Sequence, residues 1–168
     1  MSQNNSDFGL QALEDAIKWC FNSEKWTPGL ILLYSSIDIM ASLNRDPAKS
    51  KVTRSDFIEW VDTYLLPDSG LNCKAIDLYA ARCGLVHSYS PDSELTRDYE
   101  ANKIYYVYGK VEAIELQTII NNSSHKELIS VHIDQLFTAL DIAVERFAKA
   151  LKDNPECVNE NETQVKRI

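Results

Sequence analysis

The sequence of 168 residues is poor in glycine, proline and cysteine, and it lacks the motifs of several enzyme classes. Its five glycines and five prolines form no glycine-rich phosphate loop, and there is no G-x-S-x-G or H-E-x-x-H pattern and no internal repeat. Its four cysteines form no Cys-x-x-Cys pair, and Cys20 and Cys83 lie in apolar helical patterns. We therefore expect reduced, mostly buried thiols, and neither a metal site nor a cofactor.

We expect neither a signal peptide nor a membrane span. The first residues, Met1 to Asp7, lack the basic and apolar regions of a signal peptide. No uninterrupted apolar run approaches the roughly 18 residues that a membrane span needs. We expect a cytoplasmic protein without a membrane partner.

An excess of basic residues, which is typical of proteins that coat nucleic acids, is absent as well. The net charge is −8, of which the tail after Lys152 contributes −2 and the rest of the chain −6. This balance argues against tight, sequence-independent phosphate binding, because such binding needs many Lys and Arg contacts. A small catalytic cleft can still be locally positive.

The pattern of apolar residues predicts one mainly α-helical domain, a helical bundle with a small two-stranded β element. Helical spacing predicts helices at residues 7–22, 29–43, 53–65, 72–87, 111–122 and 134–151. β-branched and aromatic residues at 103–108 and 128–133 predict two strands that pair across the helix between them. We expect the domain to span residues 1–152, followed by a polar, disordered tail at 153–168.

Several polar residues mark where the helices begin and how they pack. Thr53-x-x-Asp56 resembles a capping box, and we expect Asn72 and Asp134 to cap the helices that follow them. The polar stretch 91–102 predicts a loop. The helix at 29–43 is apolar on nearly all sides, so Asp38 needs a partner, and a structural hydrogen bond is favoured over catalysis.

One segment has residues that point to chemistry. Within the apolar stretch 80–89, Arg82, His87 and Tyr89 stand at the spacing R-x4-H-x-Y. Arginine binds phosphate through a fork of donors, and histidine exchanges a proton near pH 7, so the pair suits phosphodiester chemistry. The alternative is a core-lining helix in which Arg82 pairs with Asp77 or Asp38 while backbone groups satisfy His87 and Tyr89.

Helical geometry limits how these residues can work together. At about 100° per residue, Arg82 and His87 lie roughly 140° apart around a helix, whereas Arg82 and Tyr89 share a face. Either Gly84 allows a bend between them or a second subunit supplies the other half of the site. A cleft shared by two subunits is the simpler hypothesis.

At these residues the chain resembles the HEPN superfamily, whose helical bundles carry an R-x4-6-H motif; the narrower R-x4-H-x-Y form is that of HEPN toxins. The resemblance implies a HEPN-like domain and a homodimeric, metal-independent endoribonuclease of toxin or defence type. It implies that Arg82 holds the scissile phosphate while His87 moves protons as the 2′-hydroxyl of the RNA attacks. Tyr89 is then a supporting residue or the modification target of a nucleotidyltransferase-type antitoxin.

Other features favour different functions. Active HEPN members usually have a polar residue after the motif arginine, where this chain has Cys83, and the segment 103–133 has no counterpart in compact HEPN toxins. A non-catalytic HEPN-like dimerisation or interaction module is therefore the main alternative. A third alternative is a regulator that binds a small molecule near Asp38 and Tyr79.

The remaining histidines and a tyrosine cluster are weaker candidates. We expect His125 and His132 to be ordinary surface residues rather than catalytic groups. The tyrosines at 105, 106 and 108 can stack on bases, but packing along a half-buried strand is the favoured interpretation.

Overall fold

The described part of the chain folds mainly into helices, with one small parallel sheet, as the sequence predicts. The computed structural model describes residues 5–46, 48–88, 90, 92–98, 100–125 and 127–153. The elements in chain order are α1 (Asn5–Asn22), α2 (Trp26–Asn44), α3 (Arg54–Trp60), the π-helical turn η1 (Val61–Leu65), α4 (Ala75–Ser88), α5 (Glu94–Arg97), β1 (Lys103–Val107), α6 (Ala113–Asn121), β2 (Leu128–His132) and α7 (Ile133–Asp153).

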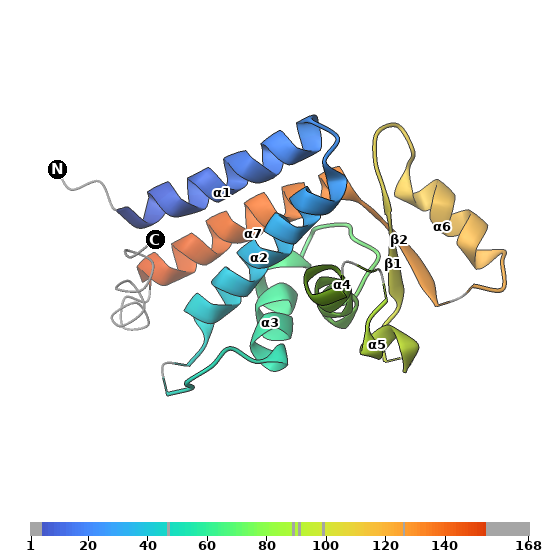
Figure 1. The fold of residues 1–168 in the computed structure, drawn as a ribbon. Helices are drawn as coiled ribbons and strands as arrows, with labels where there is room; N and C mark the ends of the chain where they lie inside the picture. Colours follow the sequence, from blue (N-terminus) through green and yellow to red (C-terminus); the bar gives the residue numbers. More distant parts are fainter. Residues whose placement is uncertain are drawn as a thin grey trace.

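Helix α2 lies at the centre of the bundle, as its apolar sequence predicts. It contacts α1, α3, α4 and α7, and the long helices α1, α2 and α7 lie above α3 and α4 in Figure 1. Leu33 and Ile37 have no exposed surface. By length and composition alone α2 is also apolar enough to cross a membrane, but 44% of that stretch is buried within the protein. Burial in the core therefore accounts for part of its apolar character.

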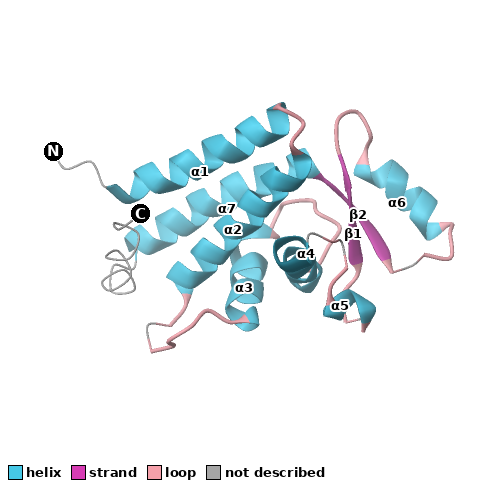
Figure 2. Ribbon diagram, in the orientation of Figure 1, coloured by secondary structure: helices cyan, strands magenta, loops and turns pink. Residues whose placement is uncertain are grey.

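The sheet lies at one end of the bundle, between α4 and α6 (Figure 2). Strands β1 and β2 pair in parallel, with Ile104 opposite Ile129 and Tyr106 opposite Val131. The pairing across the intervening helix is thus confirmed. A parallel pair requires a crossover connection, which α6 provides, and parallel strands are normally covered on both faces.

Helix α3 begins at the predicted capping box. The Asp56 carboxylate accepts hydrogen bonds from the Thr53 backbone N–H at 2.7 Å and from the Lys49 ammonium at 2.6 Å. Asp56 is 3% exposed. The hydrogen bond from Lys49, followed by that from Thr53, lowers the pKa of Asp56 to about 2. The cap therefore anchors the α2–α3 loop as well as the helix.

Some predicted helix boundaries are wrong because contacts between residues far apart in the sequence determine them. Residues 94–97 form α5 within the segment expected to be a loop. Helix α4 begins at Ala75, and it is Asp77, rather than Asn72, that accepts the Lys74 N–H at 2.8 Å. Helix α7 begins at Ile133, directly after β2, so Asp134 lies in its first turn. The predicted tail lies outside the described residues from 154 onward.

Replacing Asp56 with asparagine should make the free energy of unfolding depend less on pH in the acid range. A carboxyl with a lowered folded pKa stabilises the fold above its unfolded pKa, and this contribution is lost as the pH falls through the folded pKa. For Asp56 the window lies between its ordinary value of 3.8 and about 2. Urea unfolding should therefore show the wild-type advantage over Asp56→Asn shrinking across this window. An Asp62→Asn control, at an exposed position, should follow the wild type; a constant wild-type advantage would contradict the assignment.

Candidate functional site

Helix α4 carries both predicted catalytic positions. It runs without a break from Ala75 to Ser88, so Arg82 and His87 stand on a single α-helix and their positions are about 140° apart around its axis. The structure describes only the backbone of His87, and Tyr89 lies outside the described residues. One copy of α4 therefore does not bring positions 82 and 87 to a common face.

Asp38 of α2 holds the guanidinium of Arg82. The Arg82 Nε and Nη2 atoms lie 2.9 and 2.8 Å from Asp38 Oδ2. The two side chains are only 20% and 26% exposed. Burial lowers the pKa of Arg82, but the hydrogen bond and the charge of Asp38 outweigh that effect and raise it overall. Asp38 thus has the structural partner that the sequence requires, and the orientation of Arg82 is fixed from one side.

The other proposed partner of Arg82, Asp77, has a different role. Asp77 is 1% exposed. Its carboxylate accepts the Lys74 N–H and, at 2.7 Å, the N–H of Asn102 just before β1. It therefore ties the beginning of α4 to the beginning of the sheet, which leaves Asp38 as the carboxylate that pairs with Arg82.

A thiol, a phenol and a second arginine surround this ion pair. Arg82 Nη1 lies 3.9 Å from the Cys83 sulfur. Burial raises the pKa of the Tyr79 phenol, and the adjacent Cys83 raises it further. The guanidinium of Arg54, on α3, lies 5.9 Å from the centre of the Tyr79 ring. Both guanidiniums are thus paired with carboxylates, Arg82 with Asp38 and Arg54 with Glu100, and Tyr79 supplies an aromatic ring between them.

Sequence reasoning missed Arg54. It stands at the first position of the capped helix α3, and its guanidinium also forms an ion pair with Glu100, at 3.0 Å. Nothing near Arg54 in the sequence signals that α3 packs against α4, because that contact depends on the tertiary fold. Within the described ranges, no group of three or more His, Cys, Asp or Glu side chains is placed to hold a metal ion.

Gly84 serves a close backbone contact, and α4 does not break there. The chain after α4 turns back so that the Ser90 N–H bonds to the Gly84 carbonyl at 3.1 Å. A Cβ atom on Gly84 would lie 2.5 Å from the Ser90 carbonyl oxygen and 3.0 Å from that of Asp92. Only glycine fits this approach without a shift of the backbone, so the bend considered for Gly84 is not its role.

The substitution Gly84→Ala should therefore destabilise the fold. In an ordinary helix the change stabilises by about 1 kcal/mol. Here the clash with two backbone carbonyls should reverse the sign and cost about 1–3 kcal/mol, measured as the free energy of unfolding in urea. Val86→Ala, at an exposed position of the same helix, is the matched control and should change stability by less than about 0.5 kcal/mol. A stabilised Gly84→Ala protein would disprove the close approach.

The remaining candidates lie apart from the ion pair. His125 is exposed and lies 3.2 Å from Glu127, as expected of a surface residue. His132 is largely buried, and one ring nitrogen lies 3.3 Å from the Gly109 carbonyl. Of the tyrosine cluster, Tyr106 hydrogen-bonds to Tyr34, and burial raises the pKa of both phenols. The other two tyrosines, at 105 and 108, are each about half exposed.

Comparison with known proteins finds no relative: no protein-family model matches the chain, and no curated protein and no solved structure matches it.

Proposed function

We propose that the chain is a metal-independent endoribonuclease of HEPN toxin or defence type that acts as a homodimer. The observation that carries the proposal is the Arg82 guanidinium, which Asp38 holds in one orientation on the helix that also bears His87. An arginine fixed in this way is preorganised to receive a phosphate.

The reaction would be an intramolecular transesterification of RNA. The 2′-oxygen forms a bond to phosphorus while the bond from phosphorus to the 5′-oxygen breaks. His87 takes the proton of the 2′-hydroxyl, and a protonated His87 gives one to the leaving 5′-oxygen. Arg82 stabilises the charge that develops on the phosphoryl oxygens. The products are a 2′,3′-cyclic phosphate and a 5′-hydroxyl.

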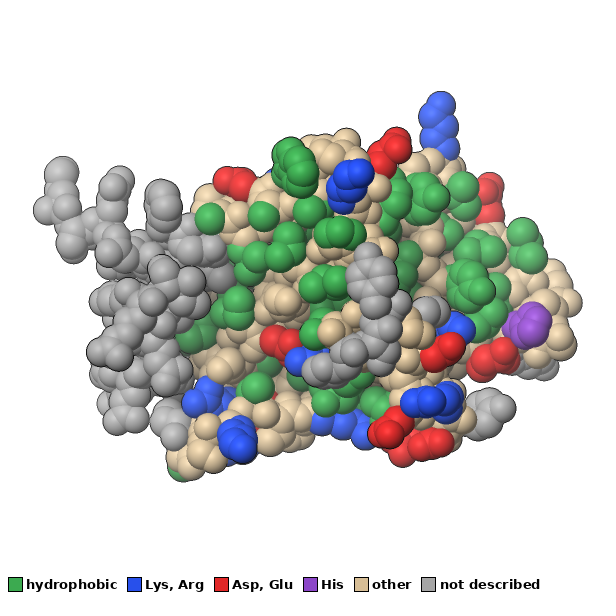
Figure 3. Space-filling view, viewed as in Figure 1, with side chains coloured by type: hydrophobic (Ala, Val, Ile, Leu, Met, Phe, Trp, Pro, Cys, Tyr) green, Lys and Arg blue, Asp and Glu red, His purple; other side chains and the backbone are tan. Residues whose placement is uncertain are grey.

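A homodimer supplies what one chain lacks. Because positions 82 and 87 lie about 140° apart on an unbroken helix, Arg82 of one protomer would face His87 of its partner. Such a two-fold cleft would bring together two Arg82 guanidiniums, each with its Asp38 carboxylate, and the two His87 positions. On the face seen in Figure 3, the lower edge carries basic side chains at the left and centre and a mixture of acidic and basic ones at the right.

The second candidate is a non-catalytic interaction module, and a specific observation favours it. Asp38 places a carboxylate directly on Arg82, where a phosphate would have to approach against its charge. In this alternative the ion pair joins α2 to α4, and α4 supplies a surface for dimerisation. A nucleotidyltransferase-type antitoxin that modifies Tyr89 belongs to the first proposal only.

RNA cleavage distinguishes the two functions. Purified protein incubated with mixed RNA in EDTA should produce fragments that end in 2′,3′-cyclic phosphates. Arg82→Ala and His87→Ala should each reduce the rate by about a hundredfold or more, because each removes one group that acts in the transition state. Arg146→Ala and His125→Ala are matched controls, since both side chains make other contacts on the surface, and they should retain the wild-type rate.

The outcome is decisive in both directions. Cleavage that survives both substitutions would come from a contaminating nuclease or from another site. A folded, dimeric wild-type protein that leaves all RNA intact would favour the interaction module.

A further inference from the structure

The two outer edges of the parallel sheet differ in the hydrogen bonds that their backbone groups receive. At the outer edge of β2, the Ser130 N–H donates to the Gln117 side-chain oxygen at 2.8 Å, and the Ser130 hydroxyl donates to the Ala113 carbonyl at 2.6 Å. Gln117 and Ser130 are 9% and 2% exposed. Helix α6 thus closes this edge with buried side-chain hydrogen bonds, which is a common protection against strand addition.

At the outer edge of β1, the described residues supply no comparable hydrogen bonds. The Lys103 N–H donates to the Glu127 carbonyl at 2.8 Å, which sets the phase of the parallel ladder. Residues 103, 105 and 107 therefore bond to β2, whereas the N–H and C=O groups of Ile104 and Tyr106 point away from it. Within the part of the chain that the structure describes, no hydrogen bond reaches these backbone groups. These groups of Ile104 and Tyr106 therefore have no hydrogen-bond partner among the described residues, and Ile104 as a whole is only 4% exposed, so a new partner would have to reach them from the groove beside the strand.

An apolar groove runs beside this open edge. It has a volume of about 250 Å³ and lies between β1, the first turns of α2 and one side of α4. The Trp26 and Tyr108 rings stack at 4.5 Å and form part of one wall. No charged side chain lines the groove, whose residues are Trp26, Thr27, Leu30, Ala81, Leu85, Ile104, Tyr106, Tyr108 and Ile133.

We propose that this groove binds an extended peptide segment of a partner protein, which adds to β1 as a third strand. The backbone of the peptide would pair with the open groups of Ile104 and Tyr106, and every second side chain would enter the apolar groove. The peptide would carry apolar residues at alternate positions. This interaction is independent of ribonuclease activity and does not involve Arg82.

A second copy of the chain fits the edge less well. The groove uses the same face of β1 that α4 covers. In a two-fold pairing of β1 with β1, the partner strand would bring its own α4 onto this face, where the first α4 already lies. An extended segment without a helical cover avoids this conflict.

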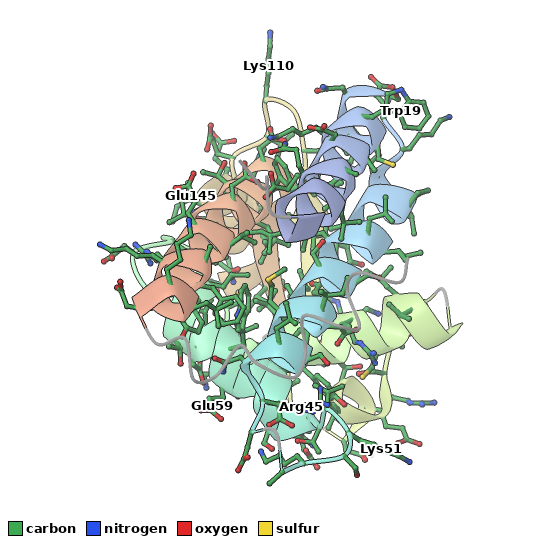
Figure 4. The ribbon with its side chains drawn as sticks, turned by 90° about the vertical axis from the view of Figure 1, so that its left-hand side faces the viewer. Trp19, Arg45, Lys51, Glu59, Lys110 and Glu145 are labelled. Carbon is green, nitrogen blue, oxygen red and sulfur yellow. The ribbon has the colours of Figure 1, made fainter. Side chains whose placement is uncertain are left out.

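Charge determines which residues should flank the apolar part of the peptide. The chain has a net charge of −8, while the groove itself is uncharged. Complementarity therefore favours a peptide with Lys or Arg outside its apolar stretch. Lys110 projects away from the body at the tip of the loop after β1 (Figure 4), so it does not add a basic group to the groove.

Amide exchange measured by NMR on the full-length protein tests the proposal, with the synthetic peptide Lys-Val-Thr-Val-Thr-Val-Lys as the probe. At saturating peptide, the amide hydrogens of Ile104 and Tyr106 should exchange at least about tenfold more slowly than in the free protein. N-methylation of the valines or of the threonines removes the donors from one edge of the peptide at a time. One of the two methylated peptides should lose binding while the other keeps it, because only one edge pairs with β1.

Substitutions in the groove give an independent readout. Leu85→Lys places a charge in the groove and should weaken peptide binding about tenfold or more. Val86→Lys, at the neighbouring exposed position of α4, is the matched control and should leave binding unchanged. If Leu85→Lys fails to fold, Thr27→Lys at the other wall of the groove replaces it.

Several results would overturn the proposal. Peptide binding that leaves the Ile104 and Tyr106 amides unprotected, or no binding of the unmethylated peptide, would do so. Protection that is already complete in the dilute free protein would show that another segment of the chain occupies the edge. Protection that appears only as the protein concentration rises would instead assign the edge to a second copy.

Discussion

The helical repeat of α4 is the constraint on which the rest of the structure depends. This helix lies between the bundle and the sheet, and contacts α2, α3, α5 and β1. A turn of about 100° per residue assigns each position to one neighbour. Leu78 enters the core, Leu85 meets the groove beside β1, Arg82 meets Asp38, and Gly84 meets the returning backbone. The same repeat separates Arg82 from His87.

The ion pair between α2 and α4 explains how a carboxylate is tolerated in the central helix. An uncompensated charge in this half-buried position would be costly, and removing one partner would leave the other without its counter-charge. The pair fixes the guanidinium of Arg82, and the buried Asp77 fixes the beginning of the same helix against the sheet. Asp38 thus holds the Arg82 side chain, while Asp77 holds the helix that carries it. This rigidity serves a phosphate site and an interaction surface equally well.

Much of this architecture follows from the sequence. The apolar spacing predicts the main helices, the aromatic and β-branched segments predict the paired strands, and the burial of α2 predicts a partner for Asp38. Local patterns do not reveal α5, the approach of Arg54 to Tyr79, or the backbone contact at Gly84, because these depend on chain segments that meet only in the folded protein. The unpaired edge of β1 likewise cannot be predicted from the sequence. It depends on which residues of β1 hydrogen-bond to β2, and it differs from the edge of β2, which the Gln117 side chain closes.

Mixing two inactive variants tests most directly whether Arg82 and His87 of different protomers share a cleft. Arg82→Ala and His87→Ala proteins are unfolded together, refolded as a mixture, and assayed for RNA cleavage beside each variant alone. In a mixed dimer, one cleft regains an intact Arg82 and an intact His87 from different protomers, while the other cleft has neither. If the cleft is shared, the mixed dimer should regain up to about half of the wild-type rate. Mixed dimers that form but remain as inactive as each parent would show that Arg82 and His87 do not act across the subunit interface.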